Sequence, residues 1–287
     1  MKKVILTPNP YRDRNFRYTL EAEKILRDSG LETAICLPFG TNREDTIPKD
    51  VPVSDLNTEL KDCDLVICFG GDGTILHASK MTLEHEIPIL GINIGTMGFM
   101  AELESSELEH LRRIAAREYS IERRMMLDVE VWRDGRKIFS DTALNDAAIT
   151  KGAVARVIQV AVYCDNVEAS AFSGDGVLVA TPTGSTAYSV SAGGPIVEAS
   201  ARNIIITPIC AHTMQAKSLV TAKDRHITVK IERIGRRNAF LSVDGGRAFR
   251  LNSEDQVRIC RSNHETLLMK VKGTSFYEIV REKLGSR

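Results

Sequence analysis

The stretch Asp64-Leu65-Val66-Ile67-Cys68-Phe69-Gly70-Gly71-Asp72-Gly73-Thr74 decides the fold of the N-terminal part of the chain. An unbroken apolar run that ends abruptly at two glycines is typical of a buried parallel strand. The residues from Thr74 to Glu84 can form a helix, so the glycines lie where a strand ends and a helix begins. In open α/β sheets, ligands bind at this end of the strands.

Strand and helix patterns alternate on both sides of this stretch. Strands are expected at 4–7, 34–37, 64–69 and 87–92, and helices at 18–29, 74–84 and, from a capping box of Ser106 with Glu109, about 106–117. This alternation predicts a Rossmann-like α/β domain with a mostly parallel sheet over residues 1–120.

From about Ile121 the pattern changes to short β-rich runs separated by turn signals, which predicts a mostly-β domain over 121–269. The tail regains a helical period over Ser275–Leu284, with apolar residues on one face. A helix this short is marginal alone, so we expect the segment 270–287 to pack back on the first domain.

Composition excludes several functional classes. Acidic and basic side chains number 38 each, so no general field attracts the chain to nucleic acid or to an anionic membrane. The six cysteines form no C-x-x-C pair and the histidines show no ligand spacing, so no structural metal is expected. Met1 leads directly into a short strand and no apolar run approaches the roughly 20 residues of a membrane span, so we expect a cytoplasmic protein.

The glycine loop has the composition of a phosphate site. Gly70, Gly71 and Gly73 let the backbone approach a phosphate, and the helix that begins near Thr74 offers free N–H groups. An acid inside such a loop repels phosphate, unless Asp72 deprotonates an attacking hydroxyl or helps to hold Mg²⁺. The alternative is a glycine turn in which the aspartate caps the helix.

Two later segments carry groups suited to a nucleoside. Asn145 and Asp146 offer a donor, an acceptor and an anion, which match the edge of an adenine and the hydroxyls of a ribose; alternatively they form an Asx turn. The segment from Thr181 to Tyr188 is dense in hydroxyls and could position a nucleotide, with Tyr188 against a base. Its alternative is a polar loop at a sheet edge.

These motifs together resemble a known family. The Gly70–Thr74 loop resembles the one shared by NAD kinases, diacylglycerol and sphingosine-type lipid kinases and phosphofructokinases, which implies ATP-dependent phosphorylation of a hydroxyl. The ordered series 91–102, 144–146, 174–195 and 207–212 is similar to the motifs of the NAD kinase family alone. Two positions depart from that pattern: Ala211 stands where the family often has Pro, and Lys217 where it often has Arg.

The resemblance implies a two-domain fold like that of NAD kinases and transfer of the γ-phosphate of ATP to the 2′-hydroxyl of the adenosine ribose of NAD, giving NADP. It implies that Asp72 is the general base and that the ATP loop is Gly70, Gly71, Gly73 and Thr74. The NAD-binding residues it implies are Asp72, Gly73, Phe99, Asn145, Asp146, Asp175, Thr186, Ala187, Tyr188 and Ser191. The implied cofactor is Mg²⁺ carried with ATP, without a protein-only metal site, and the implied assembly is a homodimer or homotetramer formed through the β-rich domain.

Two other functions are compatible with parts of the sequence. A lipid kinase with the same loop would act on diacylglycerol or sphingoid bases and associate with membranes, but the adenosine-type motifs argue against it. A non-catalytic NAD sensor would keep the fold without the reaction. The acid in the glycine loop argues against a sensor, because a carboxylate beside phosphate gives a mere binder no advantage.

Overall fold

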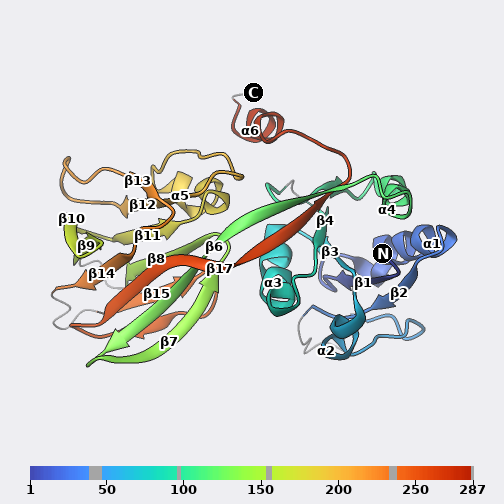
Figure 1. The fold of residues 1–287 in the computed structure, drawn as a ribbon, viewed down its shortest axis with the longest axis horizontal. Helices are drawn as coiled ribbons and strands as arrows, with labels where there is room; N and C mark the ends of the chain where they lie inside the picture. Colours follow the sequence, from blue (N-terminus) through green and yellow to red (C-terminus); the bar gives the residue numbers. More distant parts are fainter. Residues whose placement is uncertain (39–46, 96–97, 153–156, 233–237, 286–287) are drawn as a thin grey trace. The chain divides into compact units, whose positions relative to one another are not determined.

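The computed structural model describes residues 1–38, 47–95, 98–152, 157–232 and 238–285. The chain forms two compact units: Met1–Arg123 together with Thr266–Arg287, and Arg124–Glu265. It passes from one unit to the other within two long paired strands, β6 (Ser120–Arg133) and β17 (Gln256–Lys270), drawn in green and red in Figure 1. Thr96 and Met97, in the middle of one family-like motif, lie outside the described residues.

The N-terminal unit is built on a parallel sheet, which confirms the predicted α/β class. Its strands pair in the order β4-β3-β1-β2, and β5 and the end of β17 pair in parallel with β4. All six residues of β3 are buried, as expected of a strand covered on both faces. The bounds are β1 (Lys3–Pro8), β2 (Glu32–Ile35), β3 (Leu65–Gly70), β4 (Ile89–Asn93) and β5 (Leu103–Glu104).

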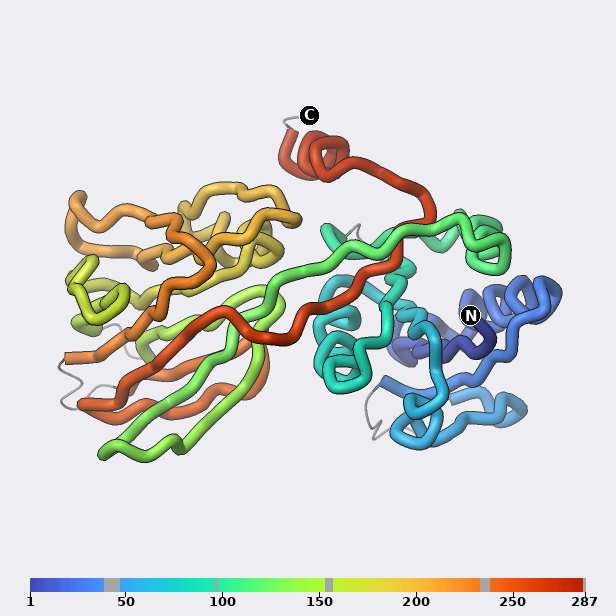
Figure 2. Tube along the Cα trace, in the orientation of Figure 1, coloured from blue at the N-terminus to red at the C-terminus, as the bar shows by residue number. Residues whose placement is uncertain are grey.

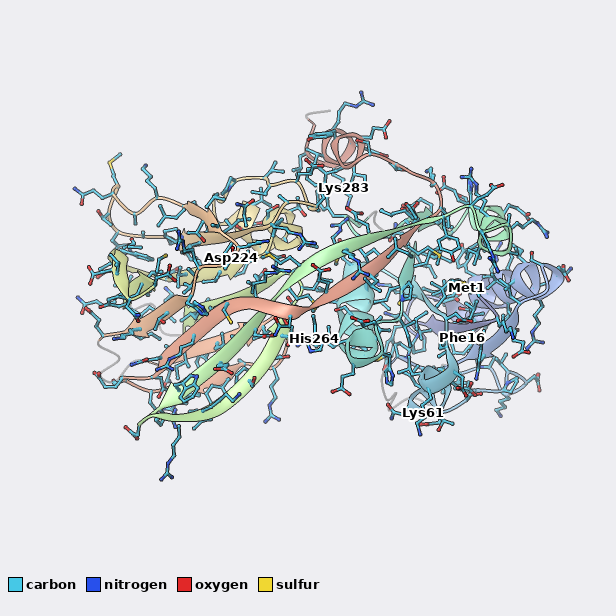
Figure 3. The ribbon with its side chains drawn as sticks, in the orientation of Figure 1. Met1, Phe16, Lys61, Asp224, His264 and Lys283 are labelled. Atoms are coloured by element: carbon cyan, nitrogen blue, oxygen red, sulfur yellow. The ribbon has the colours of Figure 1, made fainter. Side chains whose placement is uncertain are left out.

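The helices of this unit, which Figure 2 traces from blue to green with the last one in red, include those expected near 18–29 and 74–84 and a short one, at 56–59, that was not predicted. The helix after the glycines starts two residues earlier than predicted, at Asp72. Phe16, labelled in Figure 3, is fully buried in the core of this unit. The helices are α1 (Arg17–Asp28), α2 (Leu56–Glu59), α3 (Asp72–Thr82), α4 (Arg112–Ala115), α6 (Phe276–Leu284) and the 3₁₀ turns η1 (Arg14–Phe16), η3 (Leu60–Asp62), η4 (Leu83–His85) and η5 (Leu108–Leu111).

The predicted capping box of Ser106 with Glu109 is wrong. The helical segment begins at Leu108 as a 3₁₀ turn, and no side chain caps it. The carboxylate of Glu107 accepts a hydrogen bond from the backbone N–H of Glu104, so the chain before this turn is held by a different acid.

The terminal helix α6 forms where the tail was expected to be helical. A capping box of Ser275 with Glu278 fixes its start. None of its residues is fully buried, and Leu284, on the predicted apolar face, is 44% exposed. Its Lys283, labelled in Figure 3, contacts the ring of Phe99 in the same unit.

The C-terminal unit consists of two antiparallel layers around one hydrophobic core, which confirms the mostly-β prediction. One layer has the order β13-β12-β11-β8-β15-β16, and the other contains β10-β9-β14-β17 with β6 and β7. Burial alternates strictly along β14 and β15, as expected when one face of each strand meets the core.

The strands that have not yet been delimited are β7 (Arg136–Ala143), β8 (Asp146–Lys151), β9 (Ile158–Cys164), β10 (Val167–Gly174), β11 (Gly176–Ala180), β12 (Asn203–Ile209), β13 (Leu219–Ala222), β14 (Ile227–Ile231), β15 (Ala239–Val243) and β16 (Phe249–Leu251). Two helical turns follow β11: η6 (Thr183–Thr186) and α5 (Tyr188–Ser191). Across the described ranges, no helix is long and apolar enough to cross a membrane.

Candidate functional site

The glycine loop lies at the carboxyl end of β3, where the sequence placed it. Gly70 is the last residue of β3, Gly71 precedes the helix and Asp72 is its first residue. α3 has 11 residues; the N–H of Thr74 already donates to the carbonyl oxygen of Gly71 at 2.9 Å, and the N–H groups of Asp72 and Gly73 come before the first helical hydrogen bond. Such a helix N-terminus attracts anions through these N–H groups and its dipole.

The carboxylate of Asp72 turns away from its own helix toward the loop after β4. It accepts hydrogen bonds from the backbone N–H groups of Phe99, at 2.8 Å, and Met100, at 3.1 Å. The alternative of a helix-capping aspartate is therefore wrong. A carboxylate offers about four acceptor positions, so the half-buried Asp72 can still accept a hydroxyl proton.

The lack of a side chain at Gly98 leaves the space that the carboxylate of Asp72 occupies. A Cβ at this position would lie 2.0 Å from Oδ1 of Asp72, so any side chain there would displace the carboxylate. The loop after β4 thus supplies both the amides that hold Asp72 and the space that it occupies.

Two basic residues that sequence reasoning missed lie in this region. The Nζ of Lys283 lies 4.1 Å from the ring centroid of Phe99, and burial lowers the pKa of Lys283 while the carboxylate of Asp72 opposes that shift. Nη1 of Arg12 donates to the carbonyl oxygen of Ile94 at 3.3 Å. Neither residue belongs to a motif, because their positions depend on how distant segments pack.

In the C-terminal unit, strand pairing brings two of the quoted motifs together with the turn at Asp244. Asn145 directly precedes β8, and β8 pairs antiparallel with β11 on one side and β15 on the other. The start of β8 therefore lies beside the ends of both neighbours. Those ends carry the hydroxyl-rich segment from Thr181 and the turn at Asp244.

Asp244 fixes the backbone in the region where the start of β8 lies beside the ends of β11 and β15. It was not predicted as a site residue. Its carboxylate accepts hydrogen bonds from the backbone N–H groups of Leu144 at 2.8 Å, Asn145 at 2.7 Å and Asp146 at 3.0 Å. The Asx-turn alternative is therefore wrong, because a residue about a hundred positions away satisfies these N–H groups. In the sequence this position is marked by the turn signal Asp244-Gly245-Gly246 after a β-rich run.

The side chains of Asn145 and Asp146 are nearly buried, at 9% and 5% exposure. Neither forms a side-chain hydrogen bond to any other residue that the structure describes. Burial, with the nearby carboxylate of Asp244, raises the pKa of Asp146 to about 7. Buried polar groups without protein partners are costly, and hydrogen bonds to a polar ligand would offset that cost.

The hydroxyl-rich segment divides into an inner and an outer set. Thr181 donates to the carbonyl oxygen of Leu144 at 2.5 Å and accepts from the N–H of Gly184 at 3.0 Å. The outer set is half-buried or exposed and comprises Thr186, Ala187, Tyr188 and Ser191. Because the segment forms two helical turns after a central strand, it is not the edge loop of the alternative.

Within one chain, Asp175 lies at the opposite end of β11 from Asn145, Asp146 and Thr181. It precedes β11, whereas Thr181 follows it, which separates the two by about 20 Å along the strand. Its carboxylate forms an ion pair with Lys151 at 2.8 Å. Of the two departures from the family pattern, Ala211 packs half-buried against the core and Lys217 is exposed.

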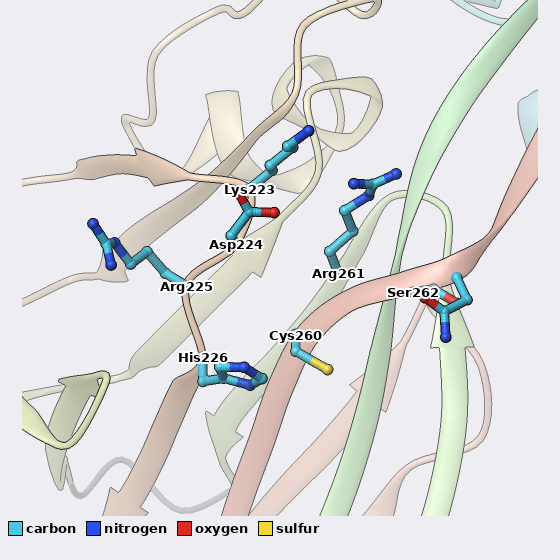
Figure 4. Close-up of a pocket in the computed structure, with 8 residues that line it drawn as sticks. Lys223, Asp224, Arg225, His226, Cys260, Arg261 and Ser262 are labelled. Carbon is cyan, nitrogen blue, oxygen red and sulfur yellow. The ribbon is translucent and has the colours of Figure 1, made fainter.

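A further cavity, of about 290 Å³, contains none of the predicted residues. It is lined by the turn Lys223–His226 and by Cys260–Asn263 of β17 (Figure 4). Arg225 points away from it and pairs with Asp165 at 2.8 Å, and Arg261 approaches Glu265 at 3.7 Å.

The described residues include no group of three or more His, Cys, Asp or Glu side chains that could hold a metal ion. In the N-terminal unit the carboxylate of Asp72 is held by two backbone N–H groups, and in the C-terminal unit that of Asp146 receives no hydrogen bond from any residue that the structure describes.

Comparisons with known proteins give a consistent result. Residues 6–119 match the family model of the ATP-NAD kinase N-terminal domain, and residues 144–271 match that of the ATP-NAD kinase C-terminal domain. The NAD kinase of Ruminiclostridium cellulolyticum is 34% identical over 289 residues, which cover 100% of this chain and 99% of that protein.

Two solved structures share the fold. Yeast NADH kinase complexed with NADH aligns with a TM-score of 0.85 and 24% identity, over 99% of this chain and 88% of that one. An NAD kinase from Archaeoglobus fulgidus in complex with ATP aligns with a TM-score of 0.74 and 24% identity, over 99% of this chain and 98% of that one. From the two matched domain models and the relative that is similar along the full chain, this protein belongs to the NAD kinase family.

Proposed function

We propose that this protein phosphorylates the 2′-hydroxyl of the adenosine ribose of NAD with ATP and so produces NADP. Membership of the family makes the chain a phosphotransferase. Neither a lipid kinase nor a non-catalytic sensor is supported, because the matched models and the relative are those of NAD kinases. The observation that carries the mechanism is the carboxylate of Asp72, held at the N-terminus of α3 with acceptor positions to spare.

In this proposal the first turn of α3 binds phosphate oxygens. Gly70, Gly71 and Gly73 bring the backbone close, and the N–H groups of Asp72 and Gly73 donate to the anion. Asp72 accepts the proton of the 2′-hydroxyl. The 2′-oxygen then forms a bond to the γ-phosphorus of ATP, the bond from that phosphorus to the β–γ bridging oxygen breaks in line, and ADP leaves. Such a reaction depends mainly on positioning and on stabilising charge, so a base fixed by two hydrogen bonds suits it.

The C-terminal unit supplies the proposed adenosine site. The buried carboxylate of Asp146 would accept the ribose hydroxyls, and the amide of Asn145 would pair with the edge of the adenine. The exposed ring of Tyr188, with Thr186 and Ser191, would cover the nucleoside.

The other predicted NAD contacts remain part of the proposal. Phe99 is a half-buried aromatic wall beside Asp72, and Gly73 is the exposed glycine next to it. Asp175 and Ala187 are assigned to the second nucleoside of the dinucleotide.

Mg²⁺ is proposed to arrive with ATP. The donor set fits this, because Mg²⁺ commonly takes phosphate and water oxygens with one or two carboxylates, and Asp72 lies in the proposed phosphate loop. When bound to the triphosphate, the ion would neutralise charge that develops on the transferred group. Asp72 is the carboxylate of the loop that could contact it.

A cytoplasmic homodimer or homotetramer is also proposed. Exposed apolar side chains on the C-terminal unit support an interface there: Met214 is 89% exposed, and Val220, on the outermost strand β13, is 49% exposed. Cysteines free of disulfides among the described residues support a reducing compartment. Light scattering on the purified protein measures the assembly directly.

The proposed reaction is tested by incubating the protein with NAD, ATP and Mg²⁺ and measuring NADP with an NADP-specific dehydrogenase. Diacylglycerol and sphingosine, each with ATP, serve as parallel acceptors. NADP formation with unmodified lipids is the expected result. Lipid phosphorylation, or NAD binding without NADP, would overturn the proposal.

A further inference from the structure

Arg12 lies in the loop that follows β1. Since β1 and β4 flank β3 in parallel, their carboxyl ends meet at one edge of the sheet. Nη1 of Arg12 lies 3.7 Å from the position that a Cβ of Gly71 would take and 3.0 Å from that of Gly95. Its guanidinium therefore extends from the β1 loop across the loops after β3 and β4.

The segment that carries Arg12 is firmly held. The backbone N–H of Asn9 donates to the carbonyl oxygen of Phe69 at 3.0 Å, and that of Arg12 to the carbonyl oxygen of Asn9 at 3.0 Å. The fully buried Asp13 accepts from the N–H groups of Tyr18 and Thr19 and so fastens the loop to α1. The backbone of Arg12 is thus fixed before any ligand binds.

The guanidinium itself remains available. The bond to the carbonyl oxygen of Ile94 uses one of its five N–H groups, and the residue is exposed. The planar fork of arginine matches phosphate geometry and keeps its charge at any physiological pH.

Charge balance calls for a cation at this edge. The loop from Gly70 to Thr74 contains no basic residue, and its Asp72 is an anion that would face a triphosphate. The ammonium of Lys283 is attracted to Asp72 and covers Phe99, so it is already opposed by a carboxylate. The guanidinium of Arg12, by contrast, lies beside Gly71, with Nη1 3.7 Å from the position that a Cβ of Gly71 would take.

We infer that Arg12 is a phosphate-binding residue of this site, which clamps the triphosphate of ATP against the glycine loop. This inference rests on the proposed kinase function. It assigns the anionic part of the donor nucleotide to two elements, the N-terminus of α3 and the loop after β1.

The test compares Arg12→Gln and Arg12→Lys with wild type, and Arg14→Gln is the matched control because Arg14 is an exposed arginine two residues away. Isothermal titration measures binding of ATP with Mg²⁺, and the NADP assay measures KM for ATP and for NAD. We expect Arg12→Gln to weaken ATP by roughly ten- to hundredfold, in line with loss of a charge-assisted contact, and to leave KM for NAD within about twofold. Arg12→Lys should recover part of the loss, and the control should match wild type.

The outcomes separate the two proposals. If wild type forms no NADP, the proposed function fails, while the titration with ATP still tests Arg12. Unchanged ATP affinity in Arg12→Gln overturns the inference. So does an equal loss of ATP and NAD affinity together with a lowered unfolding midpoint and no gain from lysine, because Arg12 would then only brace the loops.

Discussion

The carboxylate of Asp72 accepts a 2.8 Å hydrogen bond from the backbone N–H of Phe99. This bond ties the first residue of α3 to the loop after β4, which lies next to β3 in the sheet. The orientation of the proposed base is therefore set by a neighbouring loop and not by its own helix. Changes in that loop should alter the chemistry without touching Asp72.

Gly98→Ala should reduce kcat for NADP formation by roughly a hundredfold. The new Cβ would lie 2.0 Å from Oδ1 of Asp72 and displace the carboxylate, and misplacement of a reacting group by about 1 Å has a cost of this order. Steady-state kinetics check the rate, and thermal unfolding checks that the variant stays folded. A folded variant with wild-type kcat would show that the position of Asp72 is unimportant.

Asp244→Asn should destabilise the protein and raise KM for NAD. One amide oxygen replaces two carboxylate oxygens that accept three backbone N–H groups, so we expect a loss of about 1–3 kcal/mol in the free energy of unfolding. Urea denaturation measures it. Asp224→Asn is the control, because Asp224 is exposed. Equal stability of the two variants would refute the organising role of Asp244.

Asp146 should make stability depend on pH. The fold raises the pKa of this carboxyl from 3.8 to about 7, so the folded state binds its proton more tightly than the unfolded state does. The free energy of unfolding should therefore fall as pH rises from about 4 to 7, and stay low above that. Denaturation at pH 5 and pH 8 should show a smaller decline in Asp146→Asn than in wild type. Parallel declines would contradict the shifted pKa.

Lys283→Met should loosen α6. The substitution keeps the apolar stem and removes the charge 4.1 Å from the ring of Phe99, a contact worth about 0.5–1 kcal/mol at a partly exposed site. Amide hydrogen exchange within α6 should accelerate by roughly two- to fivefold. Arg281→Met, at an exposed position of the same helix, serves as control. Identical exchange in the two variants would mean that Lys283 does not hold the helix.

The sequence was informative wherever function depends on local pattern. The buried apolar strand that ends in glycines allowed the loop of Asp72 to be predicted. The change to β-rich runs near Ile121 allowed the start of the mostly-β unit to be predicted. The Asn145–Asp146 pair and the segment from Thr181 were also recognisable, because each is a contiguous motif.

Long-range relationships could not be predicted from local pattern. Arg12 depends on the adjacency of β1 and β3, Lys283 on the return of the chain to the N-terminal unit, and Asp244 on the pairing of β15 with β8. The failed capping box has the same origin, because the acid that holds the chain there is Glu107, with a backbone partner that spacing rules did not suggest.

Turnover by Asp72→Asn, a variant of nearly unchanged shape, tests directly whether Asp72 is the general base. We predict that kcat for NADP formation falls by roughly 10²–10⁴-fold, the usual contribution of a general base, while calorimetry still detects NAD binding. A folded Asp72→Asn protein that turns over at the wild-type rate would contradict the assignment of Asp72 as the base.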